Sequence, residues 1–178
     1  LSGLTYKLVP LKTPLSTQSH SLYMGGIDAD RMYKTVMGWY WGNSGGDIYH
    51  DPQTRRNSIQ YRISMARLTE KLIEEGQLKK AKDIIDLAMT NMPIDKFQYY
   101  SVVPPFAESY YLVGEKQKAR EIVEKLIEKS QQQLNYYKGL SSGDQEYYAM
   151  EIMSEIETYR QNLQIAEEHD REFYRKGV

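Results

Sequence analysis

The fold is decided by residues 66–89, which read ARLTEKLIEEGQLKKAKDIIDLAM. Apolar residues before Gly76 recur at steps of three and four, as they do along the buried face of a helix, and Gly76 closes that helix. After the glycine a second helical pattern runs to Pro93, and its face is formed by Ala81, Ile84, Ile85, Ala88 and Met92. Because only the segment EGQLK joins the two patterns, they are predicted to form a tight antiparallel hairpin.

The same pattern returns further along the chain. Residues 106–127, FAESYYLVGEKQKAREIVEKLI, again contain a glycine, an alanine five positions later and then an apolar stripe. Gly114 follows Gly76 by 38 residues, and Ala119 follows Ala81 by the same 38 residues. A fixed period of this length is typical of stacked helix pairs.

Capping residues predict a further helix upstream of the hairpin and the start of the hairpin's first helix. Asp28 can cap a short helix over residues 29–37, which would end at Gly38 in a left-handed conformation. Asp51-Pro52 predicts the start of a long helix, because the carboxylate can accept amide hydrogens of the first turn and proline fits the first helical position. Its buried stripe is expected to contain Ile59, Ile63, Ala66, Leu68, Leu72 and Ile73.

The C-terminal part is expected to hold two long helices. The pattern of residues 120–140 continues well past the end of the second repeat, and SSGDQ at 141–145 breaks it through Gly143 and the serines. Ser142 or Asp144 is expected to cap the last helix. The stripe of that helix would contain Tyr148, Ile152, Ile156, Tyr159 and Leu163.

Together these patterns predict an all-α fold of about six helices. Residues 1–27 are expected to form an extended segment and a loop, because Pro10 and Pro14 limit a short strand and the rest lacks periodicity. Residues 28–178 are expected to form one helical domain.

The hairpin resembles the tetratricopeptide repeat. That family places small, bulky, small and proline residues at fixed steps after the hairpin glycine, and the first copy meets the pattern with Gly76, Ala81, Ile85, Ala88 and Pro93. The second copy keeps Gly114 and Ala119 but has Val123, Leu126 and Gln131 at the later positions. Its period of 38 residues also exceeds the family's period of about 34. The resemblance implies an array of antiparallel helix pairs.

A longer resemblance covers most of the chain. The order GLTYKLVPLKTP, GGIDADRMYKTVM, a tryptophan-glycine loop ending in DIYHD and then AESYYLVGEKQKA looks like the soluble C-terminal region of large bacterial polytopic membrane proteins. Their membrane part resembles protein O-mannosyltransferases and is itself of unknown function. The resemblance implies a tetratricopeptide-like, periplasmic or extracytoplasmic fragment of a glycosyltransferase-like membrane protein, attached to the membrane by a missing N-terminal region, with any transferase chemistry outside this chain.

The amino-acid composition limits the kinds of partner and cofactor that the chain is expected to bind. The formal net charge of the 178 residues is −1, which gives no electrostatic reason to expect nucleic acid or an anionic membrane surface. There is no cysteine, so disulfides, thiol nucleophiles and the common zinc frameworks are excluded. No run approaches 18 apolar residues, the length of a membrane span. No metal or cofactor is expected.

The glycine-rich stretch MGWYWGNSGGDIYHDPQTRR, residues 37–56, is the most site-like segment. It lacks the spacing and the lysine of a phosphate-binding loop. Asp47, His50 and Asp51 could ligate a metal, but Asp51 is expected to cap a helix and no second histidine is near. The favoured interpretation is an ordered connection with Trp39 and Trp41 packed on the helices, glycines at unusual backbone angles and Asp51 as cap. Whether Asp47 and His50 face solvent together stays open.

Tyrosine is the better indication of function. The chain has 16 tyrosines, and two doublets, Tyr99-Tyr100 and Tyr110-Tyr111, are expected to line a binding groove. Tyrosine combines apolar area with a hydroxyl, which suits contacts to proteins, peptides or sugars. Most of the tyrosines are nevertheless expected to be core or boundary residues.

The expected function is a non-catalytic protein-interaction or scaffolding domain that binds a protein or peptide partner, or a glycan. No catalytic residue is identified, because no nucleophile lies in an elbow context and His20, His50 and His169 are scattered. The alternatives are a carbohydrate-active enzyme built around Asp47, His50 and the tryptophans, and a free-standing sugar- or peptide-binding protein.

Overall fold

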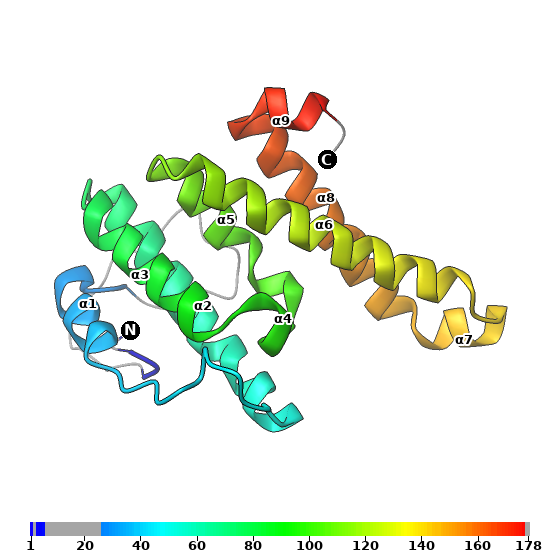
Figure 1. The fold of residues 1–178 in the computed structure, drawn as a ribbon, viewed down its shortest axis with the longest axis horizontal. Helices are drawn as coiled ribbons and strands as arrows, with labels where there is room; N and C mark the ends of the chain where they lie inside the picture. The colour runs from blue at the N-terminus through cyan, green and yellow to red at the C-terminus, as the bar shows by residue number, and fades with distance from the viewer. Residues whose placement is uncertain (2, 6–25, 177–178) are drawn as a thin grey trace. The chain divides into compact units, whose positions relative to one another are not determined.

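The structure is a computed structural model that describes residues 1, 3–5 and 26–176. Within these residues it confirms an all-α chain, with nine α-helices and one 3-10 helix where about six helices were predicted. The extended segment predicted for residues 1–27 lies almost entirely outside the described residues. The chain divides into two compact units, Leu1–Phe97 and Gln98–Val178 (Figure 1).

The first unit begins with α1 (Ala29–Met37), which starts and ends where the sequence predicted. Asp28 accepts a hydrogen bond from the amide of Arg31 at 3.0 Å and so caps the helix. The left-handed conformation predicted for Gly38 is wrong, because its φ is −87°. Its amide instead donates to the carbonyls of Lys34 and Thr35, which lets the chain leave the helix without a left-handed residue.

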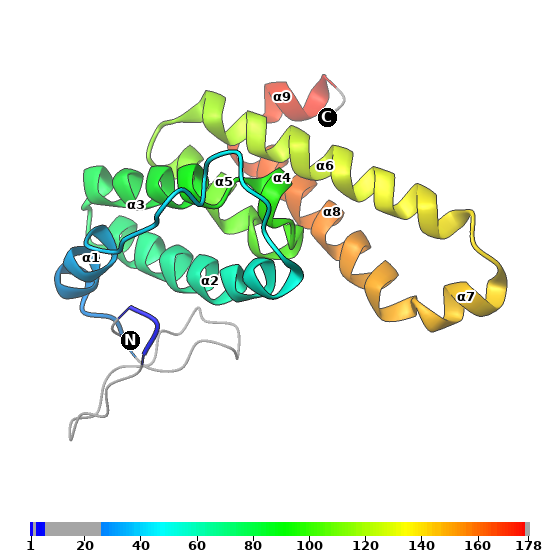
Figure 2. The same ribbon diagram turned by 60° about the horizontal axis from the view of Figure 1, so that its bottom comes forward.

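The core of the first unit is the hairpin of α2 (Pro52–Glu74) and α3 (Leu78–Asn91), which lie side by side in Figure 2. Asp51 caps α2 as predicted, because it accepts from the amides of Gln53 and Thr54. Gly76 has φ +72°, and the amide of Gln77 donates to the carbonyl of Leu72 at 2.8 Å across the turn. The face predicted for α3 is confirmed, since Ala81, Ile84, Ile85, Ala88 and Met92 are all buried.

The stripe predicted for α2 is only partly correct. Ala66, Leu68 and Leu72 are buried, but Ile59, Ile63 and Ile73 are half-buried. The prediction missed other buried side chains, among them Met65, Thr69 and Arg62. Because α2 contacts α1, α3 and α4 (Ile94–Phe97), it buries more than one stripe. Arg62 is fully buried, and its Nη2 donates to the carbonyl of Met92 at 2.9 Å.

Polar contacts attach α1 to α3. The hydroxyl of Tyr33 donates to Asp83 at 2.9 Å, and Lys80 pairs with Asp30 at 2.7 Å. Burial of Met32 and Val36 places the apolar face of α1 in the same core. The Lys80 pair is exposed and contributes little, so the buried side chains are the main attachment.

The second unit repeats the turn of the first. After a short 3-10 helix, η1 (Tyr100–Val102), α5 (Pro104–Leu112) and α6 (Lys116–Lys138) meet at Gly114, whose φ is +85°. The amide of Glu115 donates to the carbonyl of Tyr110 at 2.8 Å, the same distance as in the first turn. Ala119, like Ala81, is fully buried. The 38-residue period of the sequence is therefore a period of backbone geometry.

The long extension of α6 is confirmed, but the start of the last helix is not where it was predicted. The chain turns at Gly139, and Ser141, rather than Ser142 or Asp144, caps a short α7 (Ser142–Tyr147) that contains Gly143. The long helix α8 (Ala149–His169) follows without a side-chain cap, and α9 (Arg171–Arg175) ends the unit. In both views α6 and α8 run side by side, with α7 joining them (Figures 1 and 2).

The apolar stripe predicted for α8 is wrong. Its predicted members are half-buried or exposed, with Ile156 51% exposed. The buried residues are instead Thr158, Asn162, Ile165 and Ala166. The polar members donate hydrogen bonds within the helix, Thr158 to the carbonyl of Ser154 and Asn162 to that of Thr158. Small polar side chains allow α8 to approach α6, where Ser130 is fully buried.

Replacing the turn glycines tests the repeated geometry. Gly76→Ala and Gly114→Ala should each lower the free energy of unfolding by about 1 kcal/mol, because a residue with a Cβ is strained in the left-handed region. A Cβ at either position would meet nothing within 4 Å, so the loss would come from the backbone alone. Urea unfolding followed by circular dichroism measures it, and tryptophan fluorescence reports the first unit, which holds both tryptophans.

Gly143→Ala is the matched control. A Cβ there also meets nothing, but the residue lies inside α7 and alanine favours a helix. This variant should be as stable as the wild type or slightly more stable. Equal losses at all three glycines would contradict the left-handed requirement.

Candidate functional site

The tryptophans of the glycine-rich loop pack within the first unit. Trp39 and Trp41 contact each other edge to face, with ring centroids 5.7 Å apart. Both also contact Tyr61 of α2, at 5.2 Å and 5.8 Å. These three rings attach the loop to the long helix, which is a structural use of the aromatic side chains.

Asp47 and His50 occupy different environments. The Asp47 side chain is fully exposed, with Lys96 at 3.7 Å. His50 is buried, its Nε2 lies 2.8 Å from the carbonyl oxygen of Ser44, and its ring packs on Phe97 at a centroid distance of 4.2 Å. A buried imidazole held by a backbone carbonyl is positioned for packing, and the exposed Asp47 carboxylate lies beside Lys96 instead.

The glycines of this loop meet two different needs. Gly42 has the unusual backbone angle that the sequence predicted, with φ +57°, whereas Gly45 is required by a close backbone contact. Gly45 has an ordinary φ, but a Cβ there would collide with the carbonyl of Thr90 at the end of α3. Lys96 holds the loop from the other side by donating to the carbonyl of Gly46. Among the residues that the structure describes, no group of three histidine or acidic side chains could hold a metal ion.

The four tyrosines predicted to form one groove are divided. Tyr110 is 3% exposed and belongs to the core of the second unit. Tyr111 stacks on His169 with centroids 5.5 Å apart, and burial raises the pKa of its hydroxyl to about 12. Tyr99 and Tyr100 lie elsewhere, in the turn that precedes α5. Tyr99 and Tyr100 line one groove together, and Tyr110 and Tyr111 are not part of its lining.

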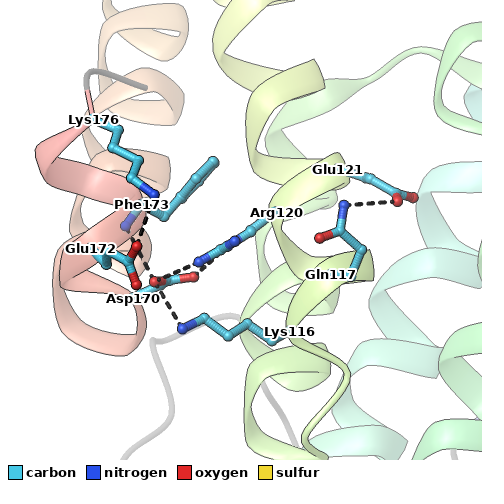
Figure 3. Close-up of polar contacts among 8 residues, drawn as sticks. All are labelled: Lys116, Gln117, Arg120, Glu121, Asp170, Glu172, Phe173 and Lys176. Atoms are coloured by element: carbon cyan, nitrogen blue, oxygen red, sulfur yellow. Dashed lines mark hydrogen bonds and ion pairs between the residues drawn. The ribbon is translucent and has the colours of Figure 1, made fainter.

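Several charged side chains gather around Asp170 near the C-terminus, as they do at many functional sites (Figure 3). Asp170 is buried, and Arg120 of α6 donates to both of its oxygens at 2.7 Å and 3.2 Å. Lys116 lies 3.1 Å from the same carboxylate, and the amide of Phe173 donates to it at 3.3 Å. All of its hydrogen-bonding capacity is directed to the protein, so the cluster fastens α9 to α6.

Removing the charge of Asp170 should destabilise the second unit. The Arg120 side chain, with help from Lys116 and the Phe173 amide, lowers the pKa of this carboxyl from its ordinary 3.8 to about 2. The stabilisation is complete above the unfolded pKa and is lost as pH falls from about 4 towards 2. Asp170→Asn, which can still cap α9, should lose about 2 kcal/mol at pH 7 in urea unfolding.

The difference between Asp170→Asn and the wild type should shrink towards zero at pH 2. Glu157→Gln is the control, because Glu157 forms only an exposed pair with Arg160 and its loss should have no measurable effect. A constant difference across the whole pH range would contradict an electrostatic role for Asp170.

The candidate site is a groove of about 390 Å³ in the second unit. We call it the tyrosine–glutamate groove, and it is lined by three segments. The turn Gln98–Ser101 contributes Tyr99 and Tyr100, α6 contributes Gln133 and Tyr137, and α8 contributes Glu151, Ser154 and Glu155. Aromatic rings, two amides and two carboxylates thus line one hollow, which can hold a small polar group or a side chain.

The turn that forms one wall has an unusual backbone. Gln98 and Tyr99 are consecutive residues at φ +57° and +50°, a region that residues with a Cβ rarely adopt. Such conformations cost free energy and persist where the surroundings impose them, often at functional sites. Here they direct the Tyr99-Tyr100 doublet into the groove lining.

The electrostatics of the groove are acidic. Burial raises the pKa of Glu155, although the hydroxyl of Ser130 donates to it at 3.1 Å. Burial also raises the pKa of Tyr137, with contributions from Glu151 and Glu155. Of the groove's lining residues, all of them in the described part of the chain, two are carboxylates and none is basic.

A second hollow adjoins the groove. It has a volume of about 320 Å³ and shares Tyr100 and Gln133 with the tyrosine–glutamate groove. Its other lining residues are Lys129, Gln132 and Tyr136. Together the two hollows offer a row of aromatic, amide and charged groups along α6.

The sequence predicted one of the three segments that line this groove and did not predict the other two. The Tyr99-Tyr100 doublet was a predicted binding element, but Gln133, Tyr137, Glu151 and Glu155 were not identified. The only available signal was the tyrosine doublet at 136–137, because the acidic residues of α8 are indistinguishable in sequence from a solvated face.

Comparisons of the chain with protein-family models, with curated proteins and with solved structures found no match. Within the described residues, no helix combines the length and apolar character required to cross a membrane.

Proposed function

We propose that this chain is a non-catalytic protein-interaction domain built from tetratricopeptide-like antiparallel helix pairs, which binds an extended peptide segment of a partner protein. The observation that carries the proposal is the tyrosine–glutamate groove, because it combines aromatic faces with amide and carboxylate groups on a helical scaffold. Such a lining suits peptide side chains and backbone amides. The repeated turn at Gly76 and Gly114 supports the helix-pair architecture.

The enzyme alternative receives less support from the geometry. It requires chemistry shared by Asp47, His50 and the tryptophans, but His50 is buried against Phe97 while Asp47 extends into solvent. The tryptophan rings are engaged with Tyr61. General acid–base catalysis requires groups within hydrogen-bond reach of one substrate.

We further propose that the chain is the extracytoplasmic part of a glycosyltransferase-like membrane protein, where it would hold a partner subunit or an acceptor chain near the membrane. The support is the resemblance in residue order from GLTYKLVPLKTP to AESYYLVGEKQKA. The coding sequence upstream of Leu1 should then encode several apolar spans of about 20 residues each. Reading that sequence decides the matter, and a plain signal peptide in its place would exclude this context.

Peptide selection tests the interaction function. A library of linear peptides displayed on phage should yield sequences that bind the wild-type chain. Tyr100→Ala, alone and combined with Gln133→Ala, should weaken binding of the selected peptides at least about tenfold, because aromatic anchors dominate interface energies. Both residues line both hollows. Fluorescence anisotropy with labelled peptides measures the affinity, and circular dichroism checks folding.

The matched control removes tyrosines that contact little. Tyr40 and Tyr49 are 96% and 83% exposed in the first unit, so Tyr40→Ala combined with Tyr49→Ala should leave peptide binding unchanged. Selected peptides that bind the Tyr100→Ala variant as tightly as the wild type would exclude the groove. A selection that yields no binding peptide would count against the proposed function itself.

A further inference from the structure

We propose that the tyrosine–glutamate groove receives the cationic side chain of a lysine or arginine residue in the bound peptide. This inference rests on the proposed peptide-binding function and specifies the residue that the peptide must carry. The residues of its lining that matter here are the tyrosines of the Gln98–Ser101 turn, Tyr137 of α6 and the two carboxylates of α8.

The acidic lining of the groove is complementary to a cationic side chain. Glu151 and Glu155 lie one helical turn apart on α8, and both line the same hollow. Within the part of the chain that the structure describes, neither carboxylate forms an ion pair, and Ser130 is the hydrogen-bond donor to Glu155. A cation placed between them would pair with two acidic groups at once.

The partial burial of Glu155 also favours binding of a cation. The side chain is half-buried, and the loss of solvent disfavours its charged form, which is seen as a raised pKa. A carboxylate without a cationic partner in such a position lowers the stability of the free protein. A bound ammonium or guanidinium group would replace the lost hydration, so binding would recover this cost.

The tyrosine rings that line the groove favour a cationic side chain as well. Tyr99, Tyr100 and Tyr137 contribute rings to the lining beside the carboxylates. Tyrosine faces attract cations, and the aliphatic part of a lysine or arginine side chain packs on the same apolar surface. A neutral saccharide would pack on the rings and donate its hydroxyls to the carboxylates, but it would leave their negative charge without a cation.

The adjoining hollow indicates where the backbone of the bound peptide would lie. Lys129 is its one charged lining residue, and Gln132 and Gln133 are amide donors and acceptors. Backbone carbonyls next to the cationic residue could accept from these groups. The basic side chain therefore belongs in the tyrosine–glutamate groove and the flanking backbone belongs beside Lys129.

Nuclear magnetic resonance titration with defined probes tests the inference. The probes are acetyl-Gly-Gly-Arg-Gly-Gly-amide, the same peptide with citrulline in place of arginine, and methyl α-mannoside. Citrulline keeps the shape of arginine and removes the charge. The arginine peptide should shift the amide signals of Tyr99, Glu151 and Glu155 at about 10 mM and bind about tenfold more tightly than the citrulline peptide.

Variants separate local recognition from general charge. Glu151→Gln combined with Glu155→Gln should weaken the arginine peptide about tenfold. Glu167→Gln combined with Glu168→Gln changes the net charge equally at exposed positions of the same helix, and it should change the affinity less than about twofold. Glu151→Gln alone alters an exposed residue and gives the same test without affecting the core.

The outcomes distinguish this inference from the function on which it rests. Equal groove binding of the arginine and citrulline peptides would overturn cation recognition and leave peptide binding intact. The same holds if phage-selected peptides require Tyr100 but contain no lysine or arginine. Absence of any shift with the arginine peptide would also overturn the inference, and groove shifts with methyl α-mannoside alone would overturn both proposals.

Discussion

Both units depend on one backbone constraint, a left-handed glycine that closes one helix and starts the next. At Gly76 and at Gly114 the following amide donates back across the turn at 2.8 Å, and the next helix begins two residues after the glycine. The reversal places the fifth residue after each glycine, Ala81 or Ala119, in full burial. A larger side chain there would push the helices apart, so the turn and the alanine are one packing device.

The two units cover their hairpins in different ways. In the first, the apolar face of α1 and the short α4 pack on α2, so α2 buries residues on more than one side. In the second, α8 packs on α6 through small polar residues that bond within their own helix, among them Thr158 and Asn162. Buried Asp170 then attaches the following helix to α6. Both units bury apolar side chains, and in the second unit directional polar contacts also attach the C-terminal helices to α6.

Local signals predicted several of the helix ends correctly. Asp28, Asp51-Pro52 and Gly76 each act where their chemistry requires, because a cap or a left-handed turn is decided within a few residues. The stripe of α8 was wrong because its apolar residues follow the helical period on a face that is only half covered, while two of the four buried residues, Thr158 and Asn162, are polar. For the groove, the sequence could identify Tyr99-Tyr100 as a binding element but not Glu151 or Glu155. That pairing depends on how α8 lies along α6, which no local pattern records.

The origin of the groove follows from helix lengths. In the second unit α6 has 23 residues and its partner α5 has 9, so about 20 Å of α6 extends beyond α5 at a rise of about 1.5 Å per residue. The chain that enters α5 must therefore approach α6 partway along its length, and Gln98 and Tyr99 reach that position only through two consecutive left-handed residues. Beyond this turn α8 is the neighbour of α6, and a hollow remains where the turn ends. The strain at Gln98–Tyr99 and the groove thus have one geometric cause, the mismatch between a repeat-length helix and an extended one.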